Sequence, residues 1–235
     1  MREVSYTTVL FDLDHTLFDS HTSEAKAFES TMQSVGVEST LDVFAVYDRL
    51  NRALWRDVES GSISPNEVKV RRFEQLLAEV GASGDPVEMG ATFVRGLADN
   101  GELYDGAWQL LVGLAATCRL ALVTNGIGSV QRGRLVRLGL DDVFEVVSIS
   151  GELGWSKPNR AIFDYTLDAM GVSECESVVM IGDSLDSDIR GGINAGLDTI
   201  WYNPAEVASR EDTISTHTVS DLGAVGQIVR SMRPG

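Results

Sequence analysis

The sequence predicts an α/β fold in which a helical bundle is inserted into a doubly wound parallel sheet. Short apolar runs rich in β-branched residues recur along the chain, and helical patterns separate the later ones, as in parallel sheets covered by helices. These runs are residues 7–11, 120–124, 144–149, 178–181 and 199–202. The segment between the first two runs shows only helical patterns and is far longer than an ordinary connection of a few residues.

This long segment is predicted to be an inserted cap domain. Apolar side chains recur at helical spacing within residues 25–35, 44–58, 65–80 and 86–97. Ser64 and Glu67 have the spacing of a capping box, and Asp85 before Pro86 repeats the start signal. Four short amphipathic helices make a small bundle. The predicted domains are a core of residues 1–17 and 101–235 and a cap of residues 18–100.

The composition limits the class of function. The 235 residues are 43% hydrophobic and 23% charged, which is typical of globular proteins, and no apolar stretch is long enough for a membrane helix. Residues 1–4 lead directly toward the first run and leave no room for a signal peptide, so we expect a cytoplasmic protein. The net charge of −16 disfavours nucleic acids and anionic membranes as partners. Cys118 and Cys175 are expected to be reduced.

The most informative stretch is the first apolar run, which ends in two acids, Asp12 and Asp14. A buried strand normally excludes acids, and ligands of open α/β sheets bind at the carboxyl ends of the strands. Because strand side chains repeat every two residues, we expect both carboxylates on the same side. An acidic turn after a core strand is the alternative interpretation.

Polar segments also follow later runs. Thr124, Asn125 and Gly126 close the second run and offer a hydroxyl, an amide and a backbone N–H to a phosphate at a helix start. Lys157 is one of three lysines in the chain, and Asp183 ends the fourth run. Taken singly, these segments have ordinary explanations as a turn, a solvated lysine and a helix cap.

Together and in this order, these segments resemble the motifs of the haloacid dehalogenase superfamily of phosphohydrolases, over the whole chain. The motifs are an Asp-x-Asp-x-Thr loop, a Thr or Ser, a Lys and an acidic Gly-Asp loop. Dehalogenating members lack an acid two residues after the nucleophile, so Asp14 indicates phosphoryl transfer. Phosphonate-cleaving relatives use a cap lysine, and neither Lys26 nor Lys69 lies in a matching context.

A finer resemblance is to the noncanonical pyrimidine 5′-nucleotidases. The residues that carry it are 54–56, 61 and 72–73 in the cap and 123–126, 182–185, 191–192 and 201–204 in the core. It implies a nucleoside monophosphate substrate whose base stacks on Trp55 and accepts hydrogen bonds from Arg72. Packing within the cap is the alternative for both side chains.

The superfamily resemblance also implies a mechanism. Asp12 attacks phosphorus, and water hydrolyses the resulting aspartyl phosphate. Asp14 protonates the leaving oxygen and then activates the water, so we expect its surroundings to favour the neutral acid. Lys157 supplies positive charge. The residues expected to hold the phosphate oxygens are Thr124, Asn125 and Gly126.

The implied cofactor is Mg²⁺, bound by Asp12, Asp183 and the backbone carbonyl of Asp14. Thr16 and Asp188 are expected to contact the residues that bind the metal rather than the metal itself. Asp188 is expected to orient Lys157 or a metal-bound water. The alternatives to a nucleotidase are a sugar-phosphate or generic phosphatase, a phosphomutase, and a catalytically silent binding protein. The substrate and the choice between monomer and homodimer stay open.

Overall fold

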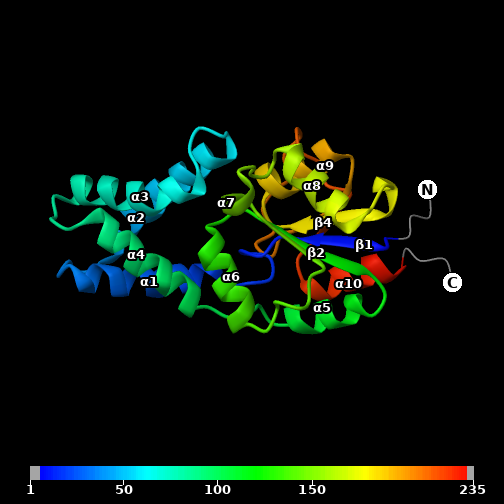
Figure 1. Ribbon diagram of the computed structural model, residues 1–235, viewed down its shortest axis with the longest axis horizontal. Coiled ribbons are helices and arrows are strands. Elements are labelled where there is room, and N and C mark those ends of the chain that lie inside the picture. Colours follow the sequence, from blue (N-terminus) through cyan, green and yellow to red (C-terminus); the bar gives the residue numbers. More distant parts are fainter. Residues whose placement is uncertain (1–5, 232–235) are drawn as a thin grey trace.

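The computed structural model describes residues 6–231 and contains a six-stranded parallel sheet flanked by helices (Figure 1). The strands are β1 (Thr8–Phe11), β2 (Arg119–Thr124), β3 (Val146–Ile149), β4 (Val178–Gly182), β5 (Asp198–Tyr202) and β6 (His217–Val219). Their order, β3-β2-β1-β4-β5-β6, confirms the doubly wound prediction. Residues 1–4, expected to lead into the first strand, lie outside the described residues.

The sequence analysis missed β6. This short edge strand pairs with β5, and only Val219 of its three residues is buried. A strand with one buried side chain has no apolar run, so periodicity does not reveal it.

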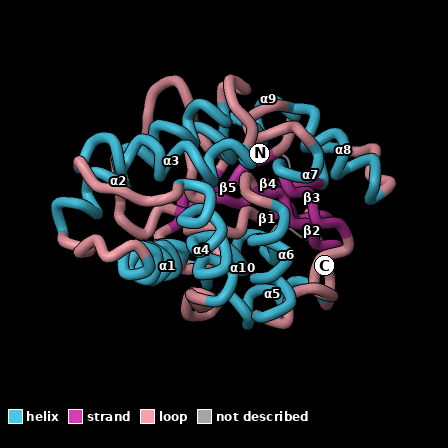
Figure 2. The backbone as a smooth tube through the Cα atoms, turned by 60° about the vertical axis from the view of Figure 1, so that its left-hand side comes forward, coloured by secondary structure: helices cyan, strands magenta, loops and turns pink. Residues whose placement is uncertain are grey.

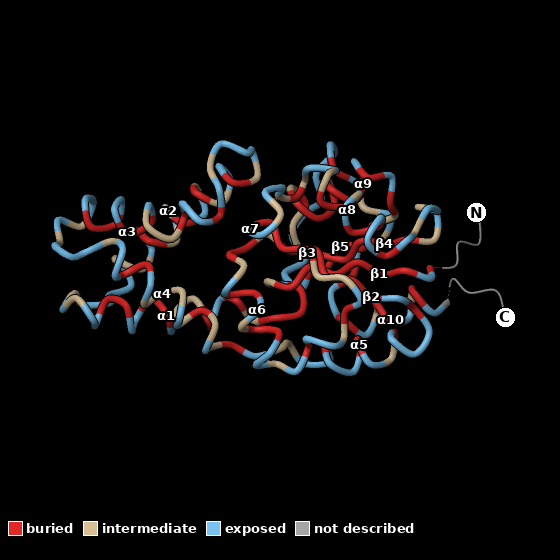
Figure 3. The backbone as a smooth tube through the Cα atoms, in the orientation of Figure 1, coloured by how far each residue is buried: buried red, intermediate tan, exposed pale blue. Residues whose placement is uncertain are grey.

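Helices cover both faces of the sheet (Figures 1 and 3). They are α5 (Ala107–Ala115), α6 (Gly128–Arg137), α7 (Ser150–Leu153), α8 (Arg160–Met170), α9 (Arg190–Ala195) and α10 (Leu222–Ser231), with a π-helical turn at Leu185–Ile189 and a 3-10 turn at Cys175–Ser177. Val9 and Phe11 of β1 pack in the cluster that includes α5 and α10, whereas Leu10 packs in the cluster that includes α8. Strands that are buried on both faces have continuous apolar sequences, which explains why β1 to β5 could be predicted from the sequence.

Four helices between β1 and β2 form the expected bundle, at the left of Figure 1. They are α1 (Ser20–Ser34), α2 (Leu41–Glu59), α3 (Pro65–Val80) and α4 (Pro86–Asp99). The predicted capping box of Ser64 and Glu67 is present, and Asp85 caps α4. The domain boundaries themselves stay a prediction. An isolated bridge between Phe18 and Leu103 joins the two chain segments that lead into and out of the bundle.

An aromatic cluster fills the bundle. Tyr47 lies at its centre, with ring centroids of Phe28, Phe73 and Phe93 at 4.7, 6.2 and 5.5 Å. Ile127 and Val130, at the start of α6, join the same buried cluster, and α4 packs on α6 (Figure 2). The bundle therefore rests on the core through apolar contacts as well as through its two connecting segments.

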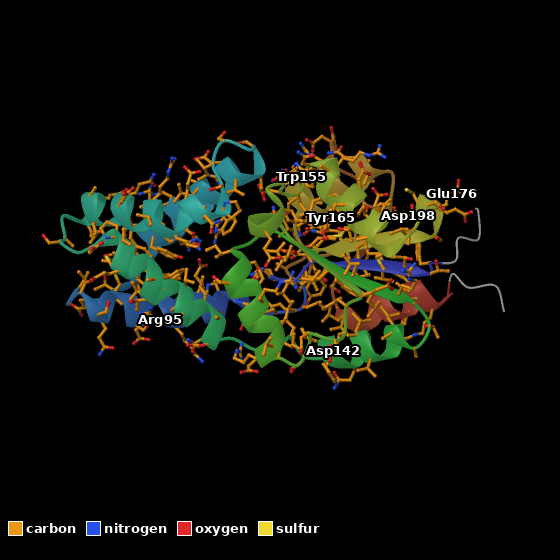
Figure 4. The ribbon with its side chains drawn as sticks, viewed as in Figure 1. Arg95, Asp142, Trp155, Tyr165, Glu176 and Asp198 are labelled. Atoms are coloured by element: carbon orange, nitrogen blue, oxygen red, sulfur yellow. The ribbon has the colours of Figure 1, made fainter. Side chains whose placement is uncertain are left out.

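The surface carries the charge. Arg95 on the cap and Asp142 and Glu176 on the core are exposed and are labelled in Figure 4. Within residues 6–231, none of the helices combines the length and the apolar character needed to cross a membrane.

A glycine substitution tests the packing of the cap. A Cβ atom at Gly90 in α4 would lie 2.6 Å from the carbonyl oxygen of Lys69 in α3. We expect Gly90→Ala to lower the free energy of unfolding by about 1–3 kcal/mol, although alanine is the better helix former. Gly113→Ala in α5 is the control, because its Cβ would meet only a terminal nitrogen of Arg230, at 3.3 Å. Denaturant melts that rank Gly90→Ala as no less stable than Gly113→Ala would contradict this packing.

Candidate active site

The polar segments predicted from the sequence meet at the carboxyl ends of β1, β2 and β4. β1 and β4 are neighbours although β2 and β3 intervene in the chain, so this edge is the topological switch point of the sheet, where ligands bind. A cavity of about 720 Å³ lies here and extends to the cap. Its lining includes Asp12, Asp14, Lys157 and Asp183 from the core and Asn51, Trp55 and Arg72 from the cap.

A buried lysine organises the core side of the cavity. Lys157 is 1% exposed, and its Nζ donates to Asp12 Oδ1 at 2.5 Å and to Asp188 Oδ1 at 2.6 Å. Burial lowers the pKa of Lys157, but the two carboxylates outweigh burial and raise the pKa above its ordinary value. Asp188 therefore holds the Lys157 ammonium beside Asp12, and its role in catalysis stays a prediction.

The segment at the end of β2 makes hydrogen bonds to neighbouring parts of the protein. Asn125 accepts a hydrogen bond from the backbone N–H of Lys157 at 2.8 Å and donates one to its carbonyl at 3.0 Å. The N–H of Gly126 donates to the hydroxyl of Ser150 at 3.0 Å. Thr124 accepts from Gln131 at 2.8 Å. In this arrangement, Asn125 and Gly126 brace the loops that hold Lys157, and their roles toward a phosphate stay a prediction.

Three carboxylates crowd together beside the lysine. Asp12, Asp183 and Asp188 each place an oxygen within 4.8 Å of the others, and the Thr16 hydroxyl lies 3.4 Å from both Asp12 and Asp183. Burial raises the pKa of Asp183 to about 7, and the charge of Asp188 adds to the shift. Burial also raises the pKa of Asp12 well above its ordinary value, with Lys157 opposing and the other acids adding.

This cluster fits a divalent cation. One lysine pairs with buried Asp12 and Asp188, and partly buried Asp183 lies beside them, so the group holds more negative charge than Lys157 balances. Mg²⁺ prefers oxygen ligands and brings two positive charges, which would favour the ionised carboxylates. Asp188 was expected to contact the metal ligands and not to be one of them. In the structure, its carboxylate lies in the same cluster as those of Asp12 and Asp183.

Asp14 reaches the cavity from a turn rather than from a strand. β1 ends at Phe11, and His15 adopts a φ of 62°, so the two-residue repeat of a strand does not direct Asp14. Both Asp12 and Asp14 still line the same cavity. The donors to the Asp14 carboxylate are Ser20 Oγ at 2.5 Å, Gln131 Nε2 at 2.6 Å and Arg134 Nη1 at 2.5 Å.

These donors overturn the expectation that the surroundings of Asp14 favour its neutral form. Burial raises the pKa of Asp14, but the charge of Arg134 and the hydrogen bonds from Ser20 and Gln131 lower it by more. The net pKa lies below the ordinary value, so the carboxylate is ionised in this arrangement. The expectation was wrong because the motif around Asp14 does not reveal the guanidinium beside it.

Arg134 also connects Asp14 to the cap. It is 4% exposed, lies over the ring of Phe18 at 4.4 Å, and donates to the carbonyl of Leu97 in α4 and to Ser23 in α1. Sequence reasoning missed both Gln131 and Arg134. The sequence feature that could have indicated them is their spacing of three residues on the helix after Thr124, which places both polar side chains on one face.

The cap residues predicted to read the base both line the cavity and both pack within the cap. Trp55 is partly buried against the cluster of Leu54, Val58 and Val68. Arg72 is 1% exposed. The partners of Arg72 are the carbonyl of Val68 at 3.0 Å, the hydroxyl of Tyr47 at 3.2 Å and the ring of Phe93 at 4.9 Å. Asn51, which lines the cavity beside them, was not predicted.

Known proteins match this arrangement over most of the chain. The family model for haloacid dehalogenase-like hydrolases matches residues 6–196. Pyrimidine 5′-nucleotidase YjjG of Escherichia coli is 35% identical over 94% of this chain and 96% of its own, and pyrimidine 5′-nucleotidase PynA of Streptococcus pneumoniae is 36% identical over 91% of both chains.

A solved structure agrees with the fold. The magnesium-bound crystal structure of the HAD-hydrolase YfnB of Bacillus subtilis superposes with a TM-score of 0.88 at 34% identity, covering 96% of this chain and 99% of that one. That orthorhombic crystal form of YfnB reveals interdomain movement. Fold, motif positions and sequence similarity agree, and the chain therefore belongs to the haloacid dehalogenase-like hydrolases.

Proposed function

We propose that this hydrolase is a Mg²⁺-dependent phosphatase that cleaves nucleoside 5′-monophosphates and prefers pyrimidines. The observation that carries the proposal is the Asp12 carboxylate, held by buried Lys157 and crowded by Asp183 in a cavity that extends to the cap. The similarity to YjjG and PynA supports the choice of substrate. A cytoplasmic location and a monomeric or homodimeric state stay predictions.

The site must first overcome repulsion, because the nucleophile and the phosphate monoester are both anions. Asp12, Asp183 and the backbone carbonyl of Asp14 would hold Mg²⁺, which supplies the positive charge that the two anions need. Lys157 adds a point charge beside the nucleophile. Thr124, buried at the end of β2, would donate to a phosphate oxygen.

The reaction then proceeds in two displacements at phosphorus, with Asp12 the nucleophile of the first and the leaving group of the second. A carboxylate oxygen of Asp12 bonds to phosphorus while the bond from phosphorus to the 5′-oxygen breaks, and the leaving oxygen takes a proton from Asp14. A water then attacks the phosphorus of the aspartyl phosphate and gives its proton to Asp14, which releases phosphate and restores both carboxyl groups.

Asp14 needs a different environment for each displacement. The ionised form, which the lowered pKa of Asp14 favours, can accept the proton of the water. To donate a proton first, Asp14 must lose part of the stabilisation that Arg134 provides. Since Arg134 also bonds to α1 and α4, movement of the cap would change that stabilisation.

Asp12→Asn tests the nucleophile. We expect kcat to fall more than about a hundredfold, a loss above roughly 2.7 kcal/mol, because an amide does not attack phosphorus. Phosphate release and trapping of a phosphorylated enzyme are the measurements. Asp142→Asn, which changes an exposed acid of the core, is the matched control. A folded Asp12→Asn variant that keeps more than about a hundredth of wild-type kcat would rule out nucleophilic attack by Asp12.

The metal requirement has a predicted pH dependence. EDTA should abolish turnover, Mg²⁺ should restore it, and Ca²⁺ should bind without supporting turnover, because its coordination is larger and looser. The pKa of Asp183 is raised to about 7, so below that pH a proton competes with the metal for this carboxylate. The Mg²⁺ concentration for half-maximal activity should therefore rise as pH falls from about 8 to about 6. Full activity after exhaustive chelation would exclude the metal mechanism.

A panel of esters tests the substrate class. We expect kcat/KM to be higher for pyrimidine nucleoside 5′-monophosphates than for sugar phosphates, because the cap contacts the base, which sugar phosphates lack. Trp55→Ala should lower the ratio of these two kcat/KM values while the variant still cleaves p-nitrophenyl phosphate. Trp108→Ala, at a half-exposed tryptophan of α5 outside the cavity lining, is the control. Faster cleavage of sugar phosphates by the wild-type enzyme would leave a phosphatase but not a nucleotidase.

A further inference from the structure

Two buried polar atoms of the cap have no hydrogen-bond partner and belong to residues that line the cavity. They are Oδ1 of Asn51, on α2, and Nη2 of Arg72, on α3. Asn51 is 6% exposed and Arg72 is 1% exposed. Among the described residues, Arg190 and His217 also have such an atom, but neither lines the cavity. Buried polar atoms are nearly always paired, so these two cap atoms point to a ligand.

The hydrogen bonds behind these atoms fix what each one offers. Glu24 Oε1 accepts from the Tyr47 hydroxyl at 2.7 Å and from Asn51 Nδ2 at 2.6 Å. Since a carboxylate only accepts, the amide nitrogen of Asn51 must face Glu24, which leaves Oδ1 as an acceptor. Tyr47 uses its single proton on Glu24 and accepts from Arg72 Nη1 at 3.2 Å. Nη2 of Arg72 is therefore left as a donor.

This network favours a neutral ligand group. The positive charge of Arg72 and the negative charge of Glu24 lie at the two ends of one hydrogen-bonded chain through Tyr47. A second phosphate or a carboxylate of the substrate would face the Asn51 oxygen and Glu24, which both repel it. The group that fits has one donor for Asn51 and one acceptor for Arg72. Trp55 lines the same cavity, and an indole is suited to stacking on a planar ring.

We propose that Asn51 and Arg72 read the edge of a uracil or thymine base: Asn51 Oδ1 accepts from the ring N3–H, and Arg72 Nη2 donates to an adjacent carbonyl. This inference rests on the proposed nucleotidase function and names the feature of the substrate that the cap recognises. In uracil and thymine, N3–H lies between two carbonyl groups. Asn51 can therefore accept from N3–H while Arg72 donates to either carbonyl. Cytosine has an acceptor nitrogen in place of N3–H, which would face the Asn51 oxygen unfavourably.

The test compares three substrates on the Mg²⁺-loaded wild-type enzyme. They are ribose 5-phosphate, uridine 5′-monophosphate and 3-methyluridine 5′-monophosphate, in which a methyl group replaces the N3 proton. We expect kcat/KM to be higher for uridine monophosphate than for its 3-methyl derivative by at least about tenfold, because the derivative leaves the Asn51 oxygen unpaired.

Variants assign this discrimination to residues. Asn51→Leu keeps the branching of the side chain at Cγ but removes both the acceptor and the amide donor, and we expect it to bring the ratio of the two uridine substrates to within about twofold of one. Arg72→Lys keeps the charge but changes the donor geometry, and should lower the preference for uridine monophosphate over ribose 5-phosphate. Arg52→Ala is the control, because Arg52 lines the same cavity but is exposed and paired with Asp48. We expect it to keep the wild-type ratio.

The outcomes separate this inference from the function on which it rests. If wild-type enzyme cleaves uridine monophosphate no faster than ribose 5-phosphate, the nucleotidase function fails. If uridine monophosphate is preferred but its 3-methyl derivative is cleaved equally well, the nucleotidase stands and the reading of N3–H is wrong. An Asn51→Leu ratio equal to the wild-type ratio would also overturn the inference. Should Asn51→Leu fail to fold, Asn51→Ser replaces it, and the wild-type ratio alone still decides.

Discussion

The active site depends on one buried cation. Lys157 holds Asp12 and Asp188 together, and without its charge the crowded carboxylates at the end of β1 and β4 would repel one another in a medium that solvates them poorly. Lys157 is in turn fixed by Asn125, which binds both its backbone N–H and its carbonyl. The loop after β2 thus holds the lysine that pairs with Asp12, the residue that follows β1.

The topology explains why the site forms here. Strands β1 and β4 become neighbours only because the chain returns past β1 after building β2 and β3 on its other side. Their loops therefore diverge above the sheet and leave space for a ligand. The cap enters through the connection between β1 and β2, so the chain must leave the reacting carboxylates, build four helices and return to the same edge. The helical cap is therefore attached directly to the loop that carries Asp12 and Asp14.

Sequence reasoning identified what lies in short motifs and missed what depends on packing. Asp12, Lys157 and Asp183 follow apolar runs. Their meeting was predictable because the carboxyl ends of parallel strands lie at the same edge of a sheet. Arg134 carries no such mark: it lies on an ordinary amphipathic helix, yet it reverses the expected pKa shift of Asp14. Asn51 was equally hidden, because its importance comes from one amide oxygen that the fold leaves without a partner.

The cavity has two chemically different ends joined by Arg134. The core end is charged and suits the phosphate that every phosphomonoester carries. At the Asn51 end the charges of Glu24 and Arg72 offset each other, and one acceptor and one donor are left for a ligand. Arg134 touches Asp14 with one nitrogen and the cap helices α1 and α4 with the others. In the proposed mechanism, a base that draws the cap inward would act on the same guanidinium that lowers the pKa of Asp14. Under this proposal, binding of the base and proton transfer by Asp14 would be coupled through the buried side chain of Arg134.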